Sequence, residues 1–258
     1  MFDPGIDIQA TERPMGFCYG PGVFGPPPEL RALDGLRPSL RDPSCDGPDP
    51  VYAIAMDVGK EAHREALRQR MLLYGVVTYA RGRLGQEPIR SQGHAHKASA
   101  HCRWSTPEVY EIWRGRAVIY MHSGSGDDPG RCYAVHAAAG DVVIVPPGWV
   151  HATISADPLE PLTFGAWCHR DYGFVYDDVR RHGGIAWFPL LGEDGALRWE
   201  RNPAYGPSEL VCKPPQDYAA LGLGKGEPIY RQFQRDHDRF CFVSDPRLAL
   251  DVWRGFEP

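Results

Sequence analysis

The stretch GHAHKASAHCRWSTPEVYEIWRG, residues 93–115, holds histidine and glutamate side chains of the kind that bind metal ions. His94 and His96 are two residues apart, so in a strand both side chains project from the same face and can reach one ion. Glu108 begins an apparent strand, and Gly115, seven residues later, marks the place where that strand must turn. We therefore predict a metal site built on two neighbouring strands.

A second stretch, GDVVIVPPGWVH at residues 140–151, supplies one more imidazole. It begins with a Gly-Asp turn, continues as a buried strand, turns at Pro-Pro-Gly and ends at His151. Added to His94, His96 and Glu108, this gives a set of imidazole and carboxylate donors that suits Fe(II), Mn, Ni, Co or Zn. We expect one divalent metal ion, which, if octahedral, keeps two coordination positions for substrate or water.

Glu108 has two competitors for the last ligand position. Glu111 lies three residues further along the strand and points to the opposite face, which makes it an alternative to Glu108 and not its partner. His101 lies among the eleven residues that separate His96 from Glu108, and a loop there can bring it to the metal instead. We predict Glu108 as the ligand because only Glu108 has the glycine seven residues on.

The chain around these motifs is predicted to be all-β. From residue 71 to residue 191, short runs rich in Val, Ile, Tyr and Trp are each closed by a turn signal, and no long amphipathic helix interrupts them. The 29 glycines and 25 prolines cluster between such runs. Short strands at this spacing indicate a sandwich or a barrel.

Three parts of the chain are expected. An N-terminal arm covers residues 1–50, a barrel covers residues 51–200, and a C-terminal extension packed on the barrel covers residues 201–258. The arm is rich in Pro, Gly and Asp, and the extension has weak periodicity with one candidate helix near residues 246–254. We expect the arm to help pair two copies of the chain into a homodimer.

The composition excludes several classes of partner. With 258 residues, 43% of them hydrophobic, we expect a folded, soluble protein with a sizeable core. A formal net charge of −5 and the lack of a basic cluster argue against nucleic acid. Neither a long apolar run nor a basic start followed by an apolar core occurs, so we expect no membrane span and a cytoplasmic location. The seven scattered cysteines form no C-x-x-C pair and are expected to be reduced thiols.

The two quoted stretches together resemble the paired motifs of the cupin superfamily, whose usual forms are G-x5-H-x-H-x(3,4)-E-x6-G and G-x5-P-x-G-x2-H-x3-N. The second motif matches from Gly140 to His151, with Ser155 in place of the final Asn. The first keeps both histidines, the glutamate and the last glycine, with Pro88 at its leading position and a longer spacer. The resemblance implies a cupin β-barrel, also called a double-stranded β-helix or jelly roll.

A closer resemblance is to the cupin-type glucose-6-phosphate isomerases of archaea and some bacteria. It rests on DPVYAIAMDV, SQGHAH, EVYEIWRGRA, GDVVIVPPGWVH and RDYG, which follow the family's order within roughly residues 29–203. The resemblance implies a metal-dependent aldose–ketose isomerase that converts glucose 6-phosphate to fructose 6-phosphate through the open-chain sugar, by an enediol or a hydride shift. A sugar phosphate is thus the expected small-molecule partner.

The same resemblance implies roles for individual residues. The implied metal ligands are His94, His96, Glu108 and His151. The implied catalytic residues are Glu108, as the base for the C2 proton, His169 and Tyr172. The implied substrate contacts are Ser91, Tyr110 and Thr78, and Arg170 or Arg90 is a candidate for holding a phosphate. Two positions depart from the family, because His169 stands one residue early in its motif and Val77 lies near the place of a family threonine, with Thr78 beside it.

Two other functions are compatible with the same set of metal ligands. One is an Fe(II)-dependent dioxygenase or another metal-dependent enzyme of specialised metabolism, for which the long spacer between His96 and Glu108 would reshape the pocket. The other is a non-catalytic cupin that binds a sugar or another metabolite. Oxygen consumption distinguishes the first from an isomerase, and an unaltered ligand after long incubation identifies the second.

Overall fold

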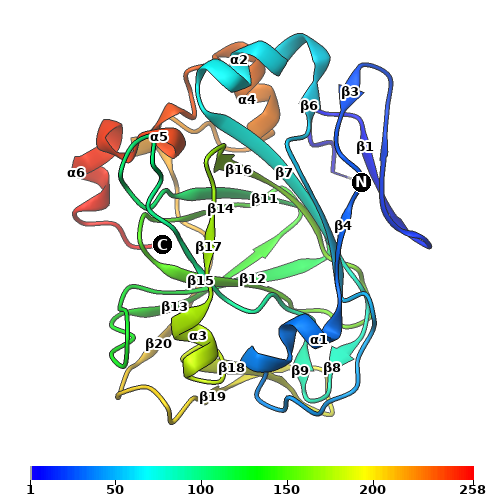
Figure 1. Cartoon of the computed structure of the whole chain (residues 1–258), viewed down its shortest axis with the longest axis vertical. Coiled ribbons are helices and arrows are strands. Elements are labelled where there is room, and N and C mark those ends of the chain that lie inside the picture. Colours follow the sequence, from blue (N-terminus) through cyan, green and yellow to red (C-terminus); the bar gives the residue numbers. More distant parts are fainter. Residues whose placement is uncertain (1) are drawn as a thin grey trace.

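Runs rich in apolar residues build two large β-sheets in the computed structural model, which describes residues 2–258 (Figure 1). The larger sheet has the strand order β14-β11-β16-β7-β5-β4. Its strands are β14 Val142–Val145, β11 Glu108–Arg114, β16 Thr163–His169, β7 Leu72–Tyr79, β5 Tyr52–Met56 and β4 Glu29–Arg31. The smaller sheet has the order β15-β12-β13-β20, with β15 Val150–Ser155, β12 Arg116–His122, β13 Cys132–Ala138 and β20 Leu210–Lys213. The predicted β-barrel architecture is confirmed.

Short strand pairs and short helices surround the two sheets. The pairs are β1 Ile8–Glu12 with β2 Met15–Tyr19, β3 Val23–Phe24 with β6 Gly59–Lys60, β8 Arg83–Leu84 with β9 Glu87–Pro88, β10 Ala95–His96 with β17 Phe174–Val175, and β18 Trp187–Leu191 with β19 Leu197–Arg201. The α-helices are α1 Leu33–Leu36, α2 Arg64–Gln69, α3 Asp177–Arg181, α4 Ile229–Arg235, α5 Cys241–Ser244 and α6 Leu250–Trp253. The 3-10 helices are η1 Arg37–Ser39, η2 Glu61–His63, η3 Ala219–Leu221 and η4 Pro246–Ala249. Within residues 2–258, every helix is too short or too polar to cross a membrane.

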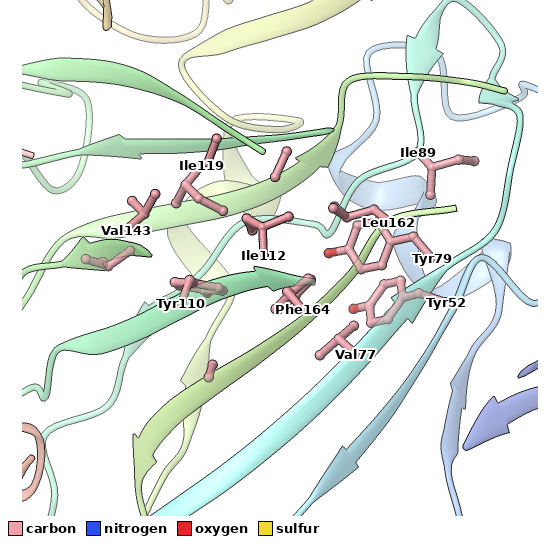
Figure 2. Packing of buried hydrophobic residues seen from close by; sticks show 14 of the residues in the cluster. Tyr52, Val77, Tyr79, Ile89, Tyr110, Ile112, Ile119, Val143, Leu162 and Phe164 are labelled. Atoms are coloured by element: carbon pink, nitrogen blue, oxygen red, sulfur yellow. The ribbon is translucent and has the colours of Figure 1, made fainter. Parts of the chain in front are cut away.

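The main core lies between the two sheets and combines inward-facing residues of both (Figure 2). Tyr110 and Phe164 come from the larger sheet, with ring centroids 5.3 Å apart. Ile119 comes from the smaller sheet and is fully buried. Each such side chain contributes roughly 1.5–3 kcal/mol by leaving water. This packing holds the strands that carry the candidate ligands in register.

Gly115 makes the turn between β11 and β12, as the sequence motif predicts. Its φ is +81°, a left-handed conformation that side chains disfavour. A Cβ atom at this position would also lie 2.7 Å from the carbonyl oxygen of Pro161. Glycine is therefore required here twice, by backbone conformation and by close approach.

Segments near both ends of the chain add edge strands to the two sheets. β4 pairs with β5 at the edge of the larger sheet, and β20 pairs in parallel with β13 at the edge of the smaller one. Helices α4 and α5, orange to red in Figure 1, cover the outer face of the larger sheet. The division into arm, barrel and extension stays a prediction, but residues outside 51–200 contribute strands and core to the folded unit.

Trp167 and Glu111 are the main contacts of the larger sheet with α4. The Trp167 ring stacks on Tyr230, with centroids 5.6 Å apart, and its Nε1 donates to the Ile229 carbonyl at 3.4 Å. Glu111 accepts a hydrogen bond from Ile229 N–H at 2.8 Å and another from Trp113 Nε1 at 3.2 Å. Glu111 therefore faces away from Glu108, as the strand alternation predicts, and anchors the C-terminal segment.

We expect the stability of the protein to fall as the pH rises from about 4.5 to about 8, because Glu111 stays protonated in the native state over this range. Burial raises the pKa of Glu111 from its usual 4.5 to about 8. Between these values the unfolded chain releases the proton and the native state keeps it, so the free energy of unfolding decreases as pH rises, by on the order of 5 kcal/mol in all. Urea unfolding at pH 5.5 and pH 8.5 measures this slope.

Glu111→Gln provides the matched comparison for the pH dependence. The variant cannot ionise, and it shares every other titrating group with the parent protein. We expect a smaller loss of stability with rising pH in the variant, whatever its stability at pH 5.5. Equal slopes for the two proteins would contradict the buried, protonated state of Glu111.

Candidate metal centre

Neighbouring segments bring the predicted metal ligands together. His94 forms a β-bridge with His151 of β15, in which His94 N–H donates to the His151 carbonyl at 3.0 Å and the reciprocal bond measures 2.9 Å. His96 ends β10, and Glu108 begins β11. The ligand atoms of the four side chains all lie within 4.8 Å of one another. The i, i+2 spacing of the first two histidines thus brings both imidazoles to one place.

Glu108 contacts two of the imidazoles. Its Oε2 lies 3.2 Å from Nε2 of His96 and 3.2 Å from Nε2 of His151. Burial acts to raise the pKa of Glu108, but hydrogen bonds from these two histidines hold it well below its usual range. Burial lowers the pKa of His94 and of His151. Burial acts to lower the pKa of His96 as well, but its hydrogen bond to Glu108 raises it above the usual value. The site therefore presents a carboxylate anion, two imidazoles that burial keeps neutral and a third whose proton a metal cation would displace.

His94 shows that a cation fits among these residues. Its Nε2 is buried and has no hydrogen-bond partner within residues 2–258. A buried polar atom without a partner costs roughly 1–3 kcal/mol, and a metal ion relieves that cost by accepting the nitrogen lone pair. Imidazole and carboxylate donors can bind Fe(II), Mn, Ni or Zn, and metal availability in the cell as well as affinity decides which ion occupies such a site. The donor set fits one divalent ion without selecting its identity.

Main-chain carbonyls orient two of the ligand rings. His96 Nδ1 lies 2.7 Å from the carbonyl oxygen of Thr106, and His151 Nδ1 lies 3.3 Å from the carbonyl oxygen of Trp149. If a metal ion displaced the Nε2 contacts with Glu108, each ring would keep its proton on Nδ1 and offer its Nε2 lone pair to the ion. Such outer contacts fix the tautomer and the orientation of metal-binding histidines.

Cys168 supports the carboxylate from the neighbouring strand. Its buried thiol donates to Glu108 Oε1 at 3.3 Å. Glu108 Oε2 is the oxygen that lies near the histidines. The two oxygens of one carboxylate are thus held by different partners, which orients Glu108 with one oxygen toward the ligand cluster.

The spacer between His96 and Glu108 is tied to the end of β16. Asp171 N–H donates to His169 Nδ1 at 3.0 Å, so the proton of His169 is on Nε2, which lies 2.9 Å from Ser99 Oγ. Ser99 Oγ in turn donates to Asp171 Oδ2 at 3.0 Å. His101 is exposed and lies outside the group of ligand atoms. The spacer therefore packs beside the site, and Glu108 rather than His101 joins the three histidines.

A small cavity adjoins the ligands on the inner face of the larger sheet. It measures about 50 Å³, room for a few water-sized groups. Its polar lining is Arg31, Tyr52, Tyr79, Ser91, Gln92, His94, Glu108, Tyr110, Thr153, Cys168 and Tyr176. Its apolar lining is Ile54, Met56, Gly75, Val77, Phe164, Ala166 and Phe174. Because Arg31, Ile54, Met56, Phe174 and Tyr176 are half-buried, the cavity opens between β4, β5 and β17.

Two of the predicted substrate contacts lie in this cavity. Tyr110 lies two residues after Glu108 on the same face of β11, and Ser91 lines the opposite side. Ser91 Oγ also accepts a hydrogen bond from Thr153 N–H at 3.0 Å. Both side chains can therefore contact a ligand that reaches the metal site.

The structure does not bring Thr78, His169, Arg170 or Tyr172 to the cavity. Thr78 faces the other side of β7 and bonds to the hydroxyl of Thr163 at 3.0 Å. His169 is held by the spacer, as described above. Arg170 donates to Asp57 at 2.8 Å and to the Leu72 carbonyl at 3.1 Å. The Tyr172 side chain is 43% exposed and lies outside the lining residues.

Sequence reasoning missed several residues of the cavity. Tyr52 and Tyr79 lie opposite each other on β5 and β7, and strand alternation predicts that they share a face with Ile54 and Val77. That alternation was available in the sequence. Arg31 enters from β4, whose pairing with β5 has no local sequence signal.

Comparisons with known proteins point to one family. Residues 36–208 match the family model described as glucose-6-phosphate isomerase (GPI). The putative glucose-6-phosphate isomerase 1 of Rhizobium meliloti is 30% identical over 131 residues, which cover 50% of this chain and 55% of that protein. The glucose-6-phosphate isomerase of Thermococcus onnurineus is 24% identical over 164 residues, which cover 57% of this chain and 80% of that protein. The chain thus spans about half the length of the first of these relatives.

Among solved structures, the oxalate decarboxylase of Bacillus subtilis aligns with a TM-score of 0.35 and 19% identity, over 48% of this chain and 27% of that one. A likeness at this level carries no conclusion about function. The matched family segment, by contrast, contains all four candidate ligands and most of the cavity.

Proposed function

The chain belongs to the glucose-6-phosphate isomerase family, and from this premise we propose that it is a metal-dependent aldose–ketose isomerase acting on glucose 6-phosphate and fructose 6-phosphate. The observation that carries the proposal is the group of His94, His96, Glu108 and His151 within 4.8 Å, beside a cavity rich in hydroxyl groups. Donors of this kind match the hydroxyls of an open-chain sugar.

The proposed mechanism assigns separate tasks to the metal and to the protein. A bound divalent ion supplies Lewis-acid polarisation of the sugar carbonyl. The three histidines and Glu108 would hold that ion, and Glu108 would also be the base that moves a proton between C2 and C1 of the sugar, while the hydroxyl proton passes between O2 and O1. Tyr110, Ser91 and Thr153 line the cavity and can hydrogen-bond the sugar hydroxyls. A hydride shift between the same carbons is the alternative, and it needs no base at the C2 carbon, although a proton must still pass from the C2 hydroxyl to the C1 oxygen.

We expect the purified protein to interconvert the two sugar phosphates when loaded with Fe(II), Mn(II), Ni(II) or Zn(II). A chelator should remove the activity, and the metal should restore it. The measurement is a coupled assay in both directions, with metal content determined in parallel. A fully loaded protein that turns over neither sugar phosphate would exclude the proposed function.

Running the same reaction in heavy water tests the role of Glu108. Exchange of the transferred hydrogen with solvent supports proton transfer by a carboxylate base. Complete retention of that hydrogen supports the hydride shift and leaves Glu108 as a ligand only.

The apolar floor of the cavity favours one second candidate. Ile54, Val77 and Phe164 form a continuous row across β5, β7 and β16. A floor of this kind suits a less polar substrate, as expected for an Fe(II)-dependent dioxygenase. Oxygen consumption by the Fe(II)-loaded protein with a candidate substrate would support this second function, because an isomerase consumes none.

The homodimer and the cytoplasmic location stay predictions, and light scattering tests the homodimer.

A further inference from the structure

Arg31 contributes the one cationic side chain among the described residues that line the cavity. It lies on β4, where it pairs directly with Tyr52 of β5, so both side chains project from the same face of the sheet. Residue 31 precedes the segment 36–208 that matches the family model. The family comparison therefore assigns no role to this arginine.

Arg31 lines the same cavity as the metal ligands His94 and Glu108. Glu108 lies on β11, with β16, β7 and β5 between it and β4. The cavity thus has an anionic, metal-binding side and a cationic side, separated by the curved inner face of one sheet.

Polar groups surround Arg31 at the mouth. Tyr176 lines the mouth on the side of β17, and its ring centroid is 5.7 Å from that of His94. Gln92 lines the same cavity, and its Oε1 accepts a hydrogen bond from Arg180 Nε at 2.9 Å. Because that oxygen is held by Arg180, the amide NH2 of Gln92 is left as a donor toward the cavity. A guanidinium, an amide and tyrosine hydroxyls are together suited to an oxyanion.

Because the cavity is small, the phosphate group of a bound hexose phosphate would lie at its mouth. The enclosed space of about 50 Å³ holds only part of a hexose phosphate. With C1 and C2 of the sugar at the metal, the remaining carbons and the phosphate must extend toward the opening between β4, β5 and β17. The opening is where Arg31 lies, with its side chain 29% exposed.

Glu29 does not prevent this use of Arg31. The two side chains form an ion pair on the same strand, but the Glu29 side chain is 61% exposed. Exposed pairs of this kind contribute about 0–1 kcal/mol, whereas phosphate binds a guanidinium through two charge-assisted hydrogen bonds. A phosphate can therefore displace the glutamate.

We propose that Arg31, with Gln92 on the lining of the same cavity, binds the phosphate group of the substrate and determines the preference for phosphorylated over neutral sugars. This rests on the proposed function for the identity of the substrate, but the anion site can be tested without turnover. The polyols sorbitol 6-phosphate and sorbitol lack a carbonyl, so neither can be isomerised. They differ only in the phosphate that Arg31 would bind.

Calorimetric titration of the metal-loaded protein with the two polyols tests the proposal. We expect Arg31→Gln to bind sorbitol 6-phosphate about 10- to 100-fold more weakly, the range for losing hydrogen bonds to a charged group, with sorbitol affected less than about 2-fold. Arg31→Lys should retain part of the preference because it keeps the charge. Glu29→Gln should bind sorbitol 6-phosphate as tightly as the parent protein or more so. Arg198→Gln, at an exposed arginine on β19, is the control and should change nothing.

Three results would overturn the proposal. In the first, the parent protein binds sorbitol 6-phosphate no more tightly than sorbitol. In the second, Arg31→Gln leaves sorbitol 6-phosphate binding unchanged. In the third, it weakens both polyols equally, as a general disturbance of the cavity would. If the protein prefers the phosphorylated polyol through Arg31 but does not turn over glucose 6-phosphate, the anion site is supported and the isomerase function is excluded. If Arg31→Gln leaves turnover of glucose 6-phosphate unaffected, the isomerase function is supported and the anion site is excluded.

Discussion

Replacing His151 with alanine is expected to abolish metal binding and, with it, isomerase activity. His151 is 1% exposed and lies against both His94, through paired backbone bonds, and Glu108, through Nε2. Its removal deletes one of the four ligands, while the backbone bonds to His94 need no side chain. Loss of a contact that only orients a ligand costs about 10–100-fold in metal affinity, so loss of the ligand itself should cost more than about 100-fold.

The same variant should lose at least about 1,000-fold in the rate of isomerisation, the equivalent of the several kcal/mol that a metal ion contributes to catalysis. Metal content after dialysis and calorimetric metal titration measure the binding directly, independent of any substrate. His136→Ala, at an exposed histidine on β13, is the matched control and should keep both metal and activity. One equivalent of metal bound by His151→Ala with the parent affinity would exclude His151 as a ligand.

Replacing Phe233 with alanine should destabilise the whole protein, although the residue lies near the C-terminus. Phe233 is fully buried on α4, and its ring centroid is 4.8 Å from that of Trp167 on β16. Truncating a buried phenylalanine typically costs about 3–5 kcal/mol, because apolar burial is lost and a void remains. Urea unfolding followed by tryptophan fluorescence measures this loss.

Leu248 provides the control for Phe233 on the same segment. Its side chain is 66% exposed, so Leu248→Ala should change the free energy of unfolding by less than about 0.5 kcal/mol. Similar small effects for both variants would show that the C-terminal segment does not share the core of the larger sheet. A single unfolding transition in the Phe233→Ala protein would show that segment and sheet unfold together.

The ligand group was predictable because its geometry depends on local rules. Two residues of spacing place His94 and His96 on one side, and the motif around His151 includes its own turn and strand. Glu108 and Glu111 were separated by strand alternation alone, and the structure places them on opposite faces. Rules of this kind act within one strand or one turn, so they can be applied without knowledge of the rest of the fold.

The substrate contacts were harder to predict because a shift of one residue along a strand reverses the face. Thr78 adjoins the inward-facing Val77 and therefore points outward. His169 follows the inward-facing Cys168, so its side chain also points away from the cavity. Arg31 depends instead on a pairing between β4 and β5, which only the assembled sheet reveals. A family resemblance therefore predicts which residue type stands at a position more reliably than it predicts the face of the strand from which that side chain projects.

The carbonyl contacts of His96 and His151 have a consequence for how the protein can change over generations. Both rings are oriented by the main chain, at Thr106 and at Trp149, and every amino acid offers a carbonyl there. A change of side chain at Thr106 or Trp149 therefore leaves the hydrogen-bond acceptor of each ring in place. The orientation of these two ligands depends on the course of the backbone and not on the identity of the side chains at the two positions.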